Sequence, residues 1–365
     1  MQPSRLSDIA QPDPERAIRV MVVDDSAVVR GLIARALEAD VAVTVVARAG
    51  NGQAALAQLE HVEVDVIVLD LEMPVMDGMT ALPLILARRP GVRVIVASTL
   101  TFRNARLCLD TLQAGASDYV SKPESGGLVN AEAFHQQLLA KVRALGGAPE
   151  PGGGAPTPDP APRPSPRPVP PPSARTTRPE IIVIGGSTGA PPALVQVFEA
   201  LRGLTLPILL TQHMPPMFTA LLAEQLSRAG DRPCREAVDG EPVVPGRAYV
   251  APGGWHMTVE RAASGPVIRL DHEPPEHFCR PAVDPLMRSV ARTYGASALA
   301  VILTGMGSDG ASGCAAIAEA GGRFVVQDEA TSVVWGMPGA AARTGRVEAI
   351  LPLSRIGEWL RRAAA

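Results

Sequence analysis

A proline-rich stretch near the middle of the chain limits what its 365 residues can fold into. Twelve of the 36 prolines lie between Pro149 and Pro172, mixed with Gly, Ala, Ser and Arg, and no apolar periodicity survives there. Such a segment buries too little apolar surface to fold and favours extended polyproline II backbone. We therefore predict that residues 146–179 are a flexible linker between two domains. A ligand for proline-motif receptors is the alternative interpretation.

The sequences on either side of this linker are each long enough to bury a hydrophobic core. Hydrophobic residues make up 46% and charged residues 19% of the chain, and the net charge of −3 gives no basis for nucleic-acid binding. No apolar run is long enough to span a membrane, and the four cysteines have neither disulfide nor zinc spacing. We expect a cytoplasmic protein with reduced thiols, no nucleic-acid partner and no membrane insertion.

Regular alternation of strands and helices begins after residues 1–17, which are polar and predict a loose leader. Short apolar runs predict strands, and apolar residues at i, i+3, i+4 and i+7 predict helices between them. The expected strands cover 19–23, 41–47, 64–69, 92–97 and 118–120, and the expected helices include 29–37, 54–59 and 131–145. The alternation predicts an α/β domain over residues 18–145, with a doubly wound, flavodoxin-like sheet of five parallel strands.

Polar side chains follow these predicted strands at the point where each strand ends. They are Asp24, Asp25, Asp70, Ser98 and Lys122. The carboxyl ends of parallel strands line the ligand crevice of an open α/β sheet, so we expect these side chains to meet there. Three adjacent carboxylates favour a hard divalent cation such as Mg²⁺, beside which a carboxylate attacks a phosphoryl group. Solvated acids scattered over the surface are the alternative.

A resemblance to the receiver domain of two-component response regulators rests on three motifs: Val22-Val23-Asp24-Asp25-Ser26, Asp70-Leu71-Glu72-Met73-Pro74-Val75-Met76-Asp77-Gly78 and Ser121-Lys122-Pro123. The resemblance covers residues 18–143. It implies that Asp70 is the phosphoacceptor and that a sensor histidine kinase is the phosphodonor. It also implies an Mg²⁺ site held by Asp24, Asp25, Asp70 and the Glu72 carbonyl. Ser98 and Lys122 would contact the phosphoryl group. Tyr119 corresponds to the aromatic residue that rotates in receivers.

A second α/β pattern begins at Ile181, after the linker. Apolar runs predict strands at 181–184, 206–210, 298–303 and 323–327, and helices are expected at 216–226, 311–320 and 352–362. Residues 234–270 predict short strands and turns. Over residues 180–365 the sequence thus predicts a doubly wound, mostly parallel α/β domain.

The first turn of this domain, Gly185-Gly186-Ser187-Thr188-Gly189, fits the nucleophile pattern G-x-S-x-G. Small residues on either side let the backbone turn sharply, so that the Ser187 hydroxyl stands above the sheet. The helix N-terminus that follows favours negative charge. A glycine-rich turn that binds phosphate is the alternative interpretation.

His213 and Asp309 also directly follow predicted strands. A serine needs a base to become nucleophilic at neutral pH, and the imidazole needs a carboxylate to fix its tautomer. The chain order Ser, His, Asp differs from the order Ser, Asp, His of α/β-hydrolases. Taken singly, His213 reads as a structural histidine and Asp309 as a helix N-cap. Together with Ser187 they predict a catalytic triad.

The second half resembles the CheB family of chemotaxis protein-glutamate methylesterases in five motifs: Gly185-Gly186-Ser187-Thr188-Gly189-Ala190, Gln212-His213-Met214-Pro215, Ala251-Pro252-Gly253-Gly254, Leu303-Thr304-Gly305-Met306-Gly307-Ser308-Asp309-Gly310 and Gly336-Met337-Pro338. With the receiver, the resemblance covers almost the whole chain. It implies Ser187 as nucleophile, His213 as base and Asp309 as its orienting partner. Thr188 and the Met306 amide would shape the oxyanion site, and the ester reaction would need no cofactor.

The resemblance also implies a function. The chain would be a phosphorylation-activated serine hydrolase that demethylates glutamate γ-methyl esters and deamidates glutamines for sensory adaptation. Its partners would be a kinase of the CheA type and the cytoplasmic domain of methyl-accepting chemoreceptors. An adaptor that has kept the fold and lost turnover is the alternative. We expect the face around Ser98, Leu100 and Tyr119 to cover the Ser187 cleft, because a flexible linker transmits no conformational change along itself.

One departure from the family pattern, one candidate substrate contact and one loop remain. Trp335 stands before Gly-Met-Pro where the family often carries tyrosine, and His256 is considered as a substrate contact. The segment 273–280, flanked by His272 and containing His277 and Cys279, has no metal-ligand spacing and is interpreted as a surface loop.

Overall fold

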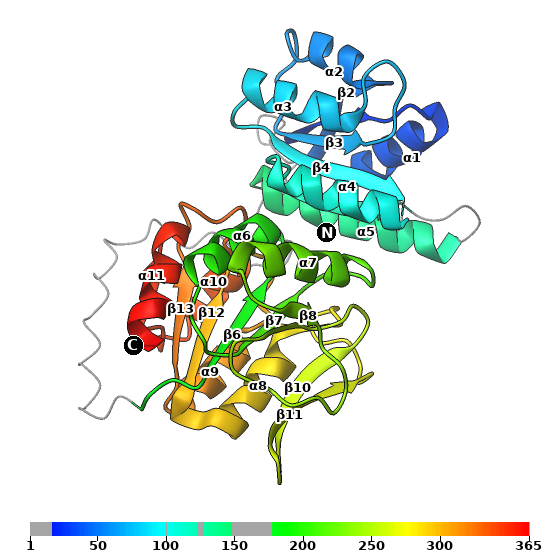
Figure 1. Ribbon diagram of the computed structural model, residues 1–365. Helices are drawn as coiled ribbons and strands as arrows, with labels where there is room; N and C mark the ends of the chain where they lie inside the picture. Colours follow the sequence, from blue (N-terminus) through cyan, green and yellow to red (C-terminus); the bar gives the residue numbers. More distant parts are fainter. Residues whose placement is uncertain (1–16, 100, 123–127, 148–176, 365) are drawn as a thin grey trace, which may run out of the picture. The chain divides into compact units, whose positions relative to one another are not determined.

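The computed structural model describes residues 17–99, 101–122, 128–147 and 177–364, which form two compact units (Figure 1). The predicted leader and most of the predicted linker lie outside the described residues, as do Leu100 and Pro123. Within the described ranges, every helix is too short or too polar to cross a membrane.

The first unit contains a five-stranded parallel sheet with the strand order β2-β1-β3-β4-β5. Its strands are β1 (Ile18–Val23), β2 (Val43–Ala49), β3 (Val66–Asp70), β4 (Arg93–Thr99) and β5 (Asp118–Lys122). Along the chain, the helices between and after these strands are α1 (Ala27–Glu38), α2 (Gly52–Gln58), α3 (Gly78–Arg88), α4 (Phe102–Gln113) and α5 (Leu128–Gly146). The predicted doubly wound sheet of five parallel strands is confirmed.

Local side chains start the helices of this unit close to the strand ends. Ser26, Asn51 and Asp77 each accept a hydrogen bond from a backbone amide in the first turn of the helix that follows. A Cβ at Gly78 would lie 2.3 Å from the carbonyl oxygen of Asp70, so only glycine lets α3 begin this close to β3. The sequence analysis did not predict α3, because Pro83 interrupts the helical pattern of apolar residues.

The second unit is built on a seven-stranded parallel sheet with the order β14-β13-β12-β6-β7-β9-β8. Its strands are β6 (Ile181–Gly186), β7 (Ile208–Gln212), β8 (Cys234–Glu236), β9 (Ala248–Val250), β12 (Ala298–Ile302), β13 (Arg323–Gln327) and β14 (Ala349–Leu351). An antiparallel hairpin of β10 (His256–Ala262) and β11 (Gly265–Asp271) stands apart from this sheet. The predicted mostly parallel α/β domain is confirmed.

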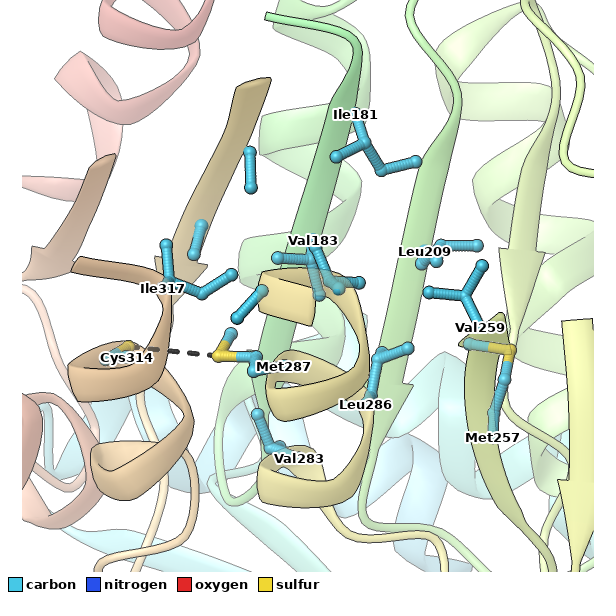
Figure 2. Close-up of a cluster of buried hydrophobic side chains, with 14 of the residues drawn as sticks. Ile181, Val183, Leu209, Met257, Val259, Val283, Leu286, Met287, Cys314 and Ile317 are labelled. Carbon is cyan, nitrogen blue, oxygen red and sulfur yellow. Dashed lines mark hydrogen bonds between the residues drawn. The ribbon is translucent and has the colours of Figure 1, made fainter. Parts of the chain in front are cut away.

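The helices of this unit are α6 (Ala190–Ala200), α7 (Phe218–Gly230), α8 (Val283–Tyr294), α9 (Ala311–Glu319), α10 (Gly336–Ala342) and α11 (Leu353–Ala364). Figure 2 shows α8 packing Leu286 and Met287 against side chains of the central strands, among them Val183. Each such buried side chain contributes about 1.5–3 kcal/mol of hydrophobic stabilisation. A Cβ at Gly185 would lie 2.5 Å from Val283 Cγ1, so the start of α8 lies over the carboxyl end of β6.

Candidate functional sites

Ser187 lies in the turn between β6 and α6, and its side chain is half-buried. The Ser187 amide donates to the Thr304 carbonyl at 3.1 Å, and the Ala190 amide donates to the Ser187 carbonyl at 3.0 Å. The turn needs Gly189, whose φ is 77° and whose added Cβ would lie 2.5 Å from Val333 Cβ. These contacts hold the serine at the carboxyl edge of the sheet, as the G-x-S-x-G pattern predicts.

The segment after β12 passes directly against this serine. A Cβ at Gly305 would lie 2.9 Å from Ser187 Cβ, so the approach depends on glycine. Thr304 Oγ1 donates to the Thr188 carbonyl at 2.9 Å, and Thr188 is buried. Met306 follows one residue after Gly305 and is half-buried. The fold thus brings Thr188 and Met306 close to the Ser187 turn, although their role at an oxyanion remains a prediction.

His213 stands at the end of β7, the strand next to β6. The register pairs Gly186 with Gln212, and the His213 amide donates to the Gly186 carbonyl at 3.2 Å. Adjacent strands lie about 4.8 Å apart, so this register places His213 beside Ser187. Gln212 Nε2 donates to the Ser187 carbonyl at 3.0 Å. Among the described residues, the Ser187 hydroxyl has no hydrogen-bond partner, and such bonds often tighten only with substrate bound.

Asp309 directs its carboxylate at His213 and at the start of α8. Asp309 Oδ2 lies 2.7 Å from His213 Nε2 and accepts from the Val283 amide at 2.6 Å. Asp309 Oδ1 accepts from the amides of Asp284 at 2.9 Å and Gly310 at 2.8 Å. The N-cap of α9 is Gly310, so the alternative interpretation of Asp309 as that N-cap is wrong. Its carboxylate instead satisfies amides at the N-terminus of α8.

Burial and this hydrogen bonding set the charges of the pair. Burial raises the pKa of Asp309. The hydrogen bond to His213, its charge and the amides of α8 together lower the pKa by more than burial raises it, so it lies below its ordinary value. Burial lowers the pKa of His213, whereas the bonds to Asp309 and Cys279 and their charges raise it to about 9. An imidazole so placed is held by a carboxylate that stabilises its cation, as a general base requires.

The segment 273–280 contributes a side chain to this site that the sequence analysis missed. Cys279 Sγ lies 3.5 Å from His213 Nδ1. The segment is a surface loop, as interpreted, and Phe278 in it is fully exposed, but its half-buried Cys279 faces His213. A pattern of neighbouring residues cannot predict this contact, because Cys279 and His213 are 66 positions apart in the sequence.

A second carboxylate lies beside Asp309 at the start of α8. Ligand atoms of His277, Asp284 and Asp309 lie within 4.8 Å of one another. Asp284 Oδ1 accepts from the Gly313 amide at 2.7 Å, and Asp284 Oδ2 lies 3.0 Å from His277 Nε2. Both carboxylates therefore serve helix N-termini and histidines, which explains the cluster without a metal ion.

His256 and Trp335 have structural contacts. His256 is buried, its Nδ1 accepts from the Ala282 amide at 3.2 Å, and its Nε2 donates to the Pro274 carbonyl at 3.1 Å. With both ring nitrogens engaged inside the fold, the interpretation of His256 as a substrate contact is wrong. Trp335 Nε1 donates to the Gln327 carbonyl at 2.9 Å, which holds the turn that leads into α10.

The carboxyl edge of the other sheet gathers the predicted acidic residues. One carboxylate oxygen from each of Asp24, Asp25 and Asp70 lies within 4.8 Å of the other two. Lys122 Nζ lies 2.6 Å from Asp24 Oδ2 and 2.9 Å from Asp70 Oδ1. Burial raises the pKa of Asp70, and the charge of Asp24 adds to this increase while Lys122 opposes it. A cation that joins the three oxygens would relieve this repulsion.

Three further residues of the predicted receiver site lie in or directly after the strands of this sheet. Ser98 is buried near the end of β4, one residue beyond Ala97, which pairs with Asp70. Glu72 follows β3 by two residues and is exposed. Tyr119 is buried in β5, with Lys141 Nζ 5.5 Å from its ring centroid. An all-oxygen carboxylate set fits Mg²⁺, which prefers such ligands and keeps several waters.

Comparisons with known proteins match both units. A family model described as CheB methylesterase matches residues 182–360, and one described as response regulator receiver domain matches residues 20–132. The chain is 51% identical to a protein-glutamate methylesterase/protein-glutamine glutaminase of Azospirillum brasilense, over 95% of this chain and 93% of the relative. It is 50% identical to a protein of that name, numbered 1, in Paramagnetospirillum magneticum, over 98% and 99% of the two chains. The crystal structure of the Thermotoga maritima CheB methylesterase catalytic domain matches 51% of this chain and 99% of its own, with 37% identity and a TM-score of 0.50.

Proposed function

Because the chain belongs to the CheB family of protein-glutamate methylesterases and carries a receiver domain ahead of the methylesterase domain, we propose that it hydrolyses glutamate γ-methyl esters of chemoreceptors through Ser187, His213 and Asp309. The same site deamidates receptor glutamines, and the protein works in the cytoplasm. The proposed domains are 18–145 and 180–365, joined by the linker 146–179 after a leader at 1–17. The bond of 2.7 Å between His213 and Asp309, at the sheet edge that carries Ser187, is the observation that carries the proposal.

In the proposed reaction, Ser187 Oγ attacks the γ-carbonyl carbon of the methylated glutamate. His213 takes the hydroxyl proton on the ring nitrogen that is not bonded to Asp309, and the buried carboxylate stabilises the imidazolium. The tetrahedral oxyanion faces backbone N–H groups near Thr188 and Met306. Methanol then leaves with the proton from His213, and an acyl-enzyme ester remains on Ser187.

Water completes the turnover at the same groups. His213 removes a proton from a water molecule, the resulting hydroxide attacks the acyl carbon, and Ser187 leaves with that proton. The product is a free γ-carboxylate on the receptor. From glutamine the leaving group of the first step is ammonia, and every later step is the same, so one site serves both activities.

A fluorophosphonate probe tests the nucleophile directly. Wild-type protein should be labelled at Ser187, and Ser187→Ala should lose both the label and methanol release from methylated receptor. His213→Ala should lose methanol release with the fold retained. If Ser187→Ala still releases methanol at the wild-type rate, the proposed site is wrong. If neither protein turns over, the adaptor interpretation replaces the enzyme.

At the receiver we propose that Asp70 accepts a phosphoryl group from a kinase of the CheA type. Asp24, Asp25, Asp70 and the Glu72 carbonyl would hold Mg²⁺, which supplies positive charge to the transferring oxygens. Lys122 and Ser98 would contact the phosphoryl group. The support is the three-carboxylate cluster with Lys122 bridging Asp24 and Asp70. Transfer moves the phosphoryl group from the kinase histidine to Asp70 Oδ.

Phosphorylation is proposed to act by relieving occlusion of the Ser187 cleft. The face around Ser98 and Tyr119 would obstruct a bulky receptor helix more than a small ester. A coupling of roughly 1–3 kcal/mol corresponds to an activation of about 5–150-fold. Deleting residues 1–145 should therefore raise demethylation of receptor while cleavage of a p-nitrophenyl ester changes little. A truncated protein no faster on receptor than the intact, unphosphorylated chain would exclude occlusion.

A further inference from the structure

A thiol contacts the imidazole of the proposed esterase site. Cys279 Sγ lies 3.5 Å from His213 Nδ1, and His213 Nε2 lies 2.7 Å from Asp309 Oδ2. The three side chains form a continuous thiol–imidazole–carboxylate chain, whereas the Ser187 hydroxyl has no hydrogen-bond partner in the described part of the chain. This arrangement is typical of an activated thiol, because the imidazole accepts its proton and the carboxylate stabilises the resulting cation.

The other three cysteines lie in different surroundings. Cys108 and Cys314 are buried, and burial raises the pKa of Cys314 well above its ordinary value. Cys234 is half-buried, like Cys279, but burial raises its pKa to about 12 although Arg232 opposes the shift. Cys279 therefore combines partial exposure with a base, and Cys234 is a matched control of similar exposure.

The backbone around Cys279 holds its sulfur beside the imidazole. The Cys279 amide donates to the Glu276 carbonyl at 2.8 Å, and the Gly254 amide donates to the Arg280 carbonyl at 3.1 Å. His277 Nε2, two residues away, lies 3.0 Å from the buried Asp284 Oδ2. Phe278, next to the cysteine, is fully exposed. The segment is thus anchored on both sides, and it holds the half-buried Cys279 next to an exposed residue at the protein surface.

We propose that Cys279 is a peroxide-sensitive control point of the esterase site, at which oxidation of the thiol occupies His213 and stops ester hydrolysis. This inference rests on the proposed function, which makes His213 the base for Ser187. Because His213 Nε2 is bonded to Asp309, Nδ1 is the nitrogen available to the serine, and it is the nitrogen that Cys279 contacts. A sulfur that carries an additional oxygen competes for it more strongly than a thiol does.

The oxidation balances with a hydroperoxide as the oxidant. The Cys279 sulfur attacks the outer oxygen of the peroxide, an S–O bond forms, and the O–O bond breaks. The thiol is oxidised to a sulfenic acid, and the peroxide is reduced to an alcohol, or to water when hydrogen peroxide reacts. The proton that the thiol loses passes through His213 to the departing oxygen. A thiol reductant then restores the cysteine, so the inhibition is reversible.

Hydrogen peroxide, applied to the full-length protein, is the probe for this site. Hydrolysis of p-nitrophenyl acetate by wild type should fall about 100-fold, the scale of losing a general base, and recover with dithiothreitol. Dimedone, which reacts with sulfenic acids, should mark Cys279 by mass spectrometry. With each rate divided by that of the same protein before treatment, Cys279→Ala and Cys279→Ser should resist peroxide, whereas Cys234→Ala should remain sensitive.

Two outcomes overturn the proposal: Cys279→Ala loses activity to peroxide as wild type does, or dimedone marks Cys234 in preference to Cys279. Should both Cys279 variants unfold, wild type under limiting peroxide decides, since activity must fall in proportion to the Cys279 adduct. Fluorophosphonate labelling tests the proposed esterase site separately from the proposed oxidation of Cys279. A serine that does not label refutes the proposed esterase, while dimedone labelling of Cys279 does not require Ser187.

Discussion

Replacing Asp309 by Asn tests the proposed catalytic triad at its carboxylate, for which the structure gives every hydrogen-bond donor. The two carboxylate oxygens accept four hydrogen bonds, from His213 and the amides of Val283, Asp284 and Gly310. An asparagine replaces one oxygen by an NH2 group, which accepts nothing. The position that the NH2 group takes decides which donors lose their acceptor, and hence which tautomer His213 adopts.

With the amide nitrogen at the Oδ1 position, the amides of Asp284 and Gly310 both lose their acceptor. At the Oδ2 position only the Val283 amide does so, because His213 can turn Nε2 into an acceptor for the NH2 group. A buried unpaired N–H costs about 1–3 kcal/mol, so the second arrangement is favoured by roughly that amount. In it the proton of His213 sits on Nδ1, and the imidazole cannot take the serine proton.

The kcat of Asp309→Asn should therefore fall by about 10⁴, which is about 5.5 kcal/mol of transition-state stabilisation. Ser187→Ala should lose more, about 10⁶ by analogy with other serine hydrolases. The assay is p-nitrophenyl acetate hydrolysis, with Tm measured on the same samples. Asp284→Asn is the matched control, since Asp284 lies beside Asp309 at the start of α8 but bonds to His277 and Gly313. A folded Asp309→Asn enzyme within tenfold of wild type would refute the tautomer argument.

Three further predictions follow from single distances or charges. Gly305→Ala should lower kcat about 100-fold, because its Cβ would lie 2.9 Å from Ser187 Cβ and displacing the serine by about 1 Å costs that much. Gly31→Ala is the control, since its Cβ would meet nothing within 4 Å and kcat should stay unchanged. Since the pKa of His213 is raised to about 9, the base is protonated at neutral pH, and kcat/KM should rise about tenfold per pH unit towards that value; a flat profile from about pH 6 to 8 contradicts this. Asp70→Asn should take up no phosphate from acetyl phosphate, and chelating Mg²⁺ should stop wild-type uptake; stoichiometric uptake by the variant would move the phosphoacceptor elsewhere.

Local patterns in the sequence were sufficient to predict the first sheet and four adjacent strands of the second, β13, β12, β6 and β7, but not its edge strand β14. Runs of Val, Ile and Leu form the central strands β3, β6 and β12, because a strand buried on both faces needs apolar residues at every position. The polar residue after such a run lies at the carboxyl edge, since parallel strands all end there. For this reason Ser187, His213 and Asp309 were predicted to meet, and the fold brings His213 and Asp309 into contact and the serine turn beside them.

Only the tertiary structure decided which groups surround these side chains. The sequence analysis did not predict α8, yet its first amides hold the Asp309 carboxylate, 26 and 25 positions further along the chain. Cys279 reaches His213 from a loop 66 positions away, and His256 is turned into the core by contacts with Pro274 and Ala282. Hydrogen bonds across such separations depend on how helices and loops pack over the sheet. Composition and periodicity describe only neighbours along the chain, so they carry no signal for these contacts.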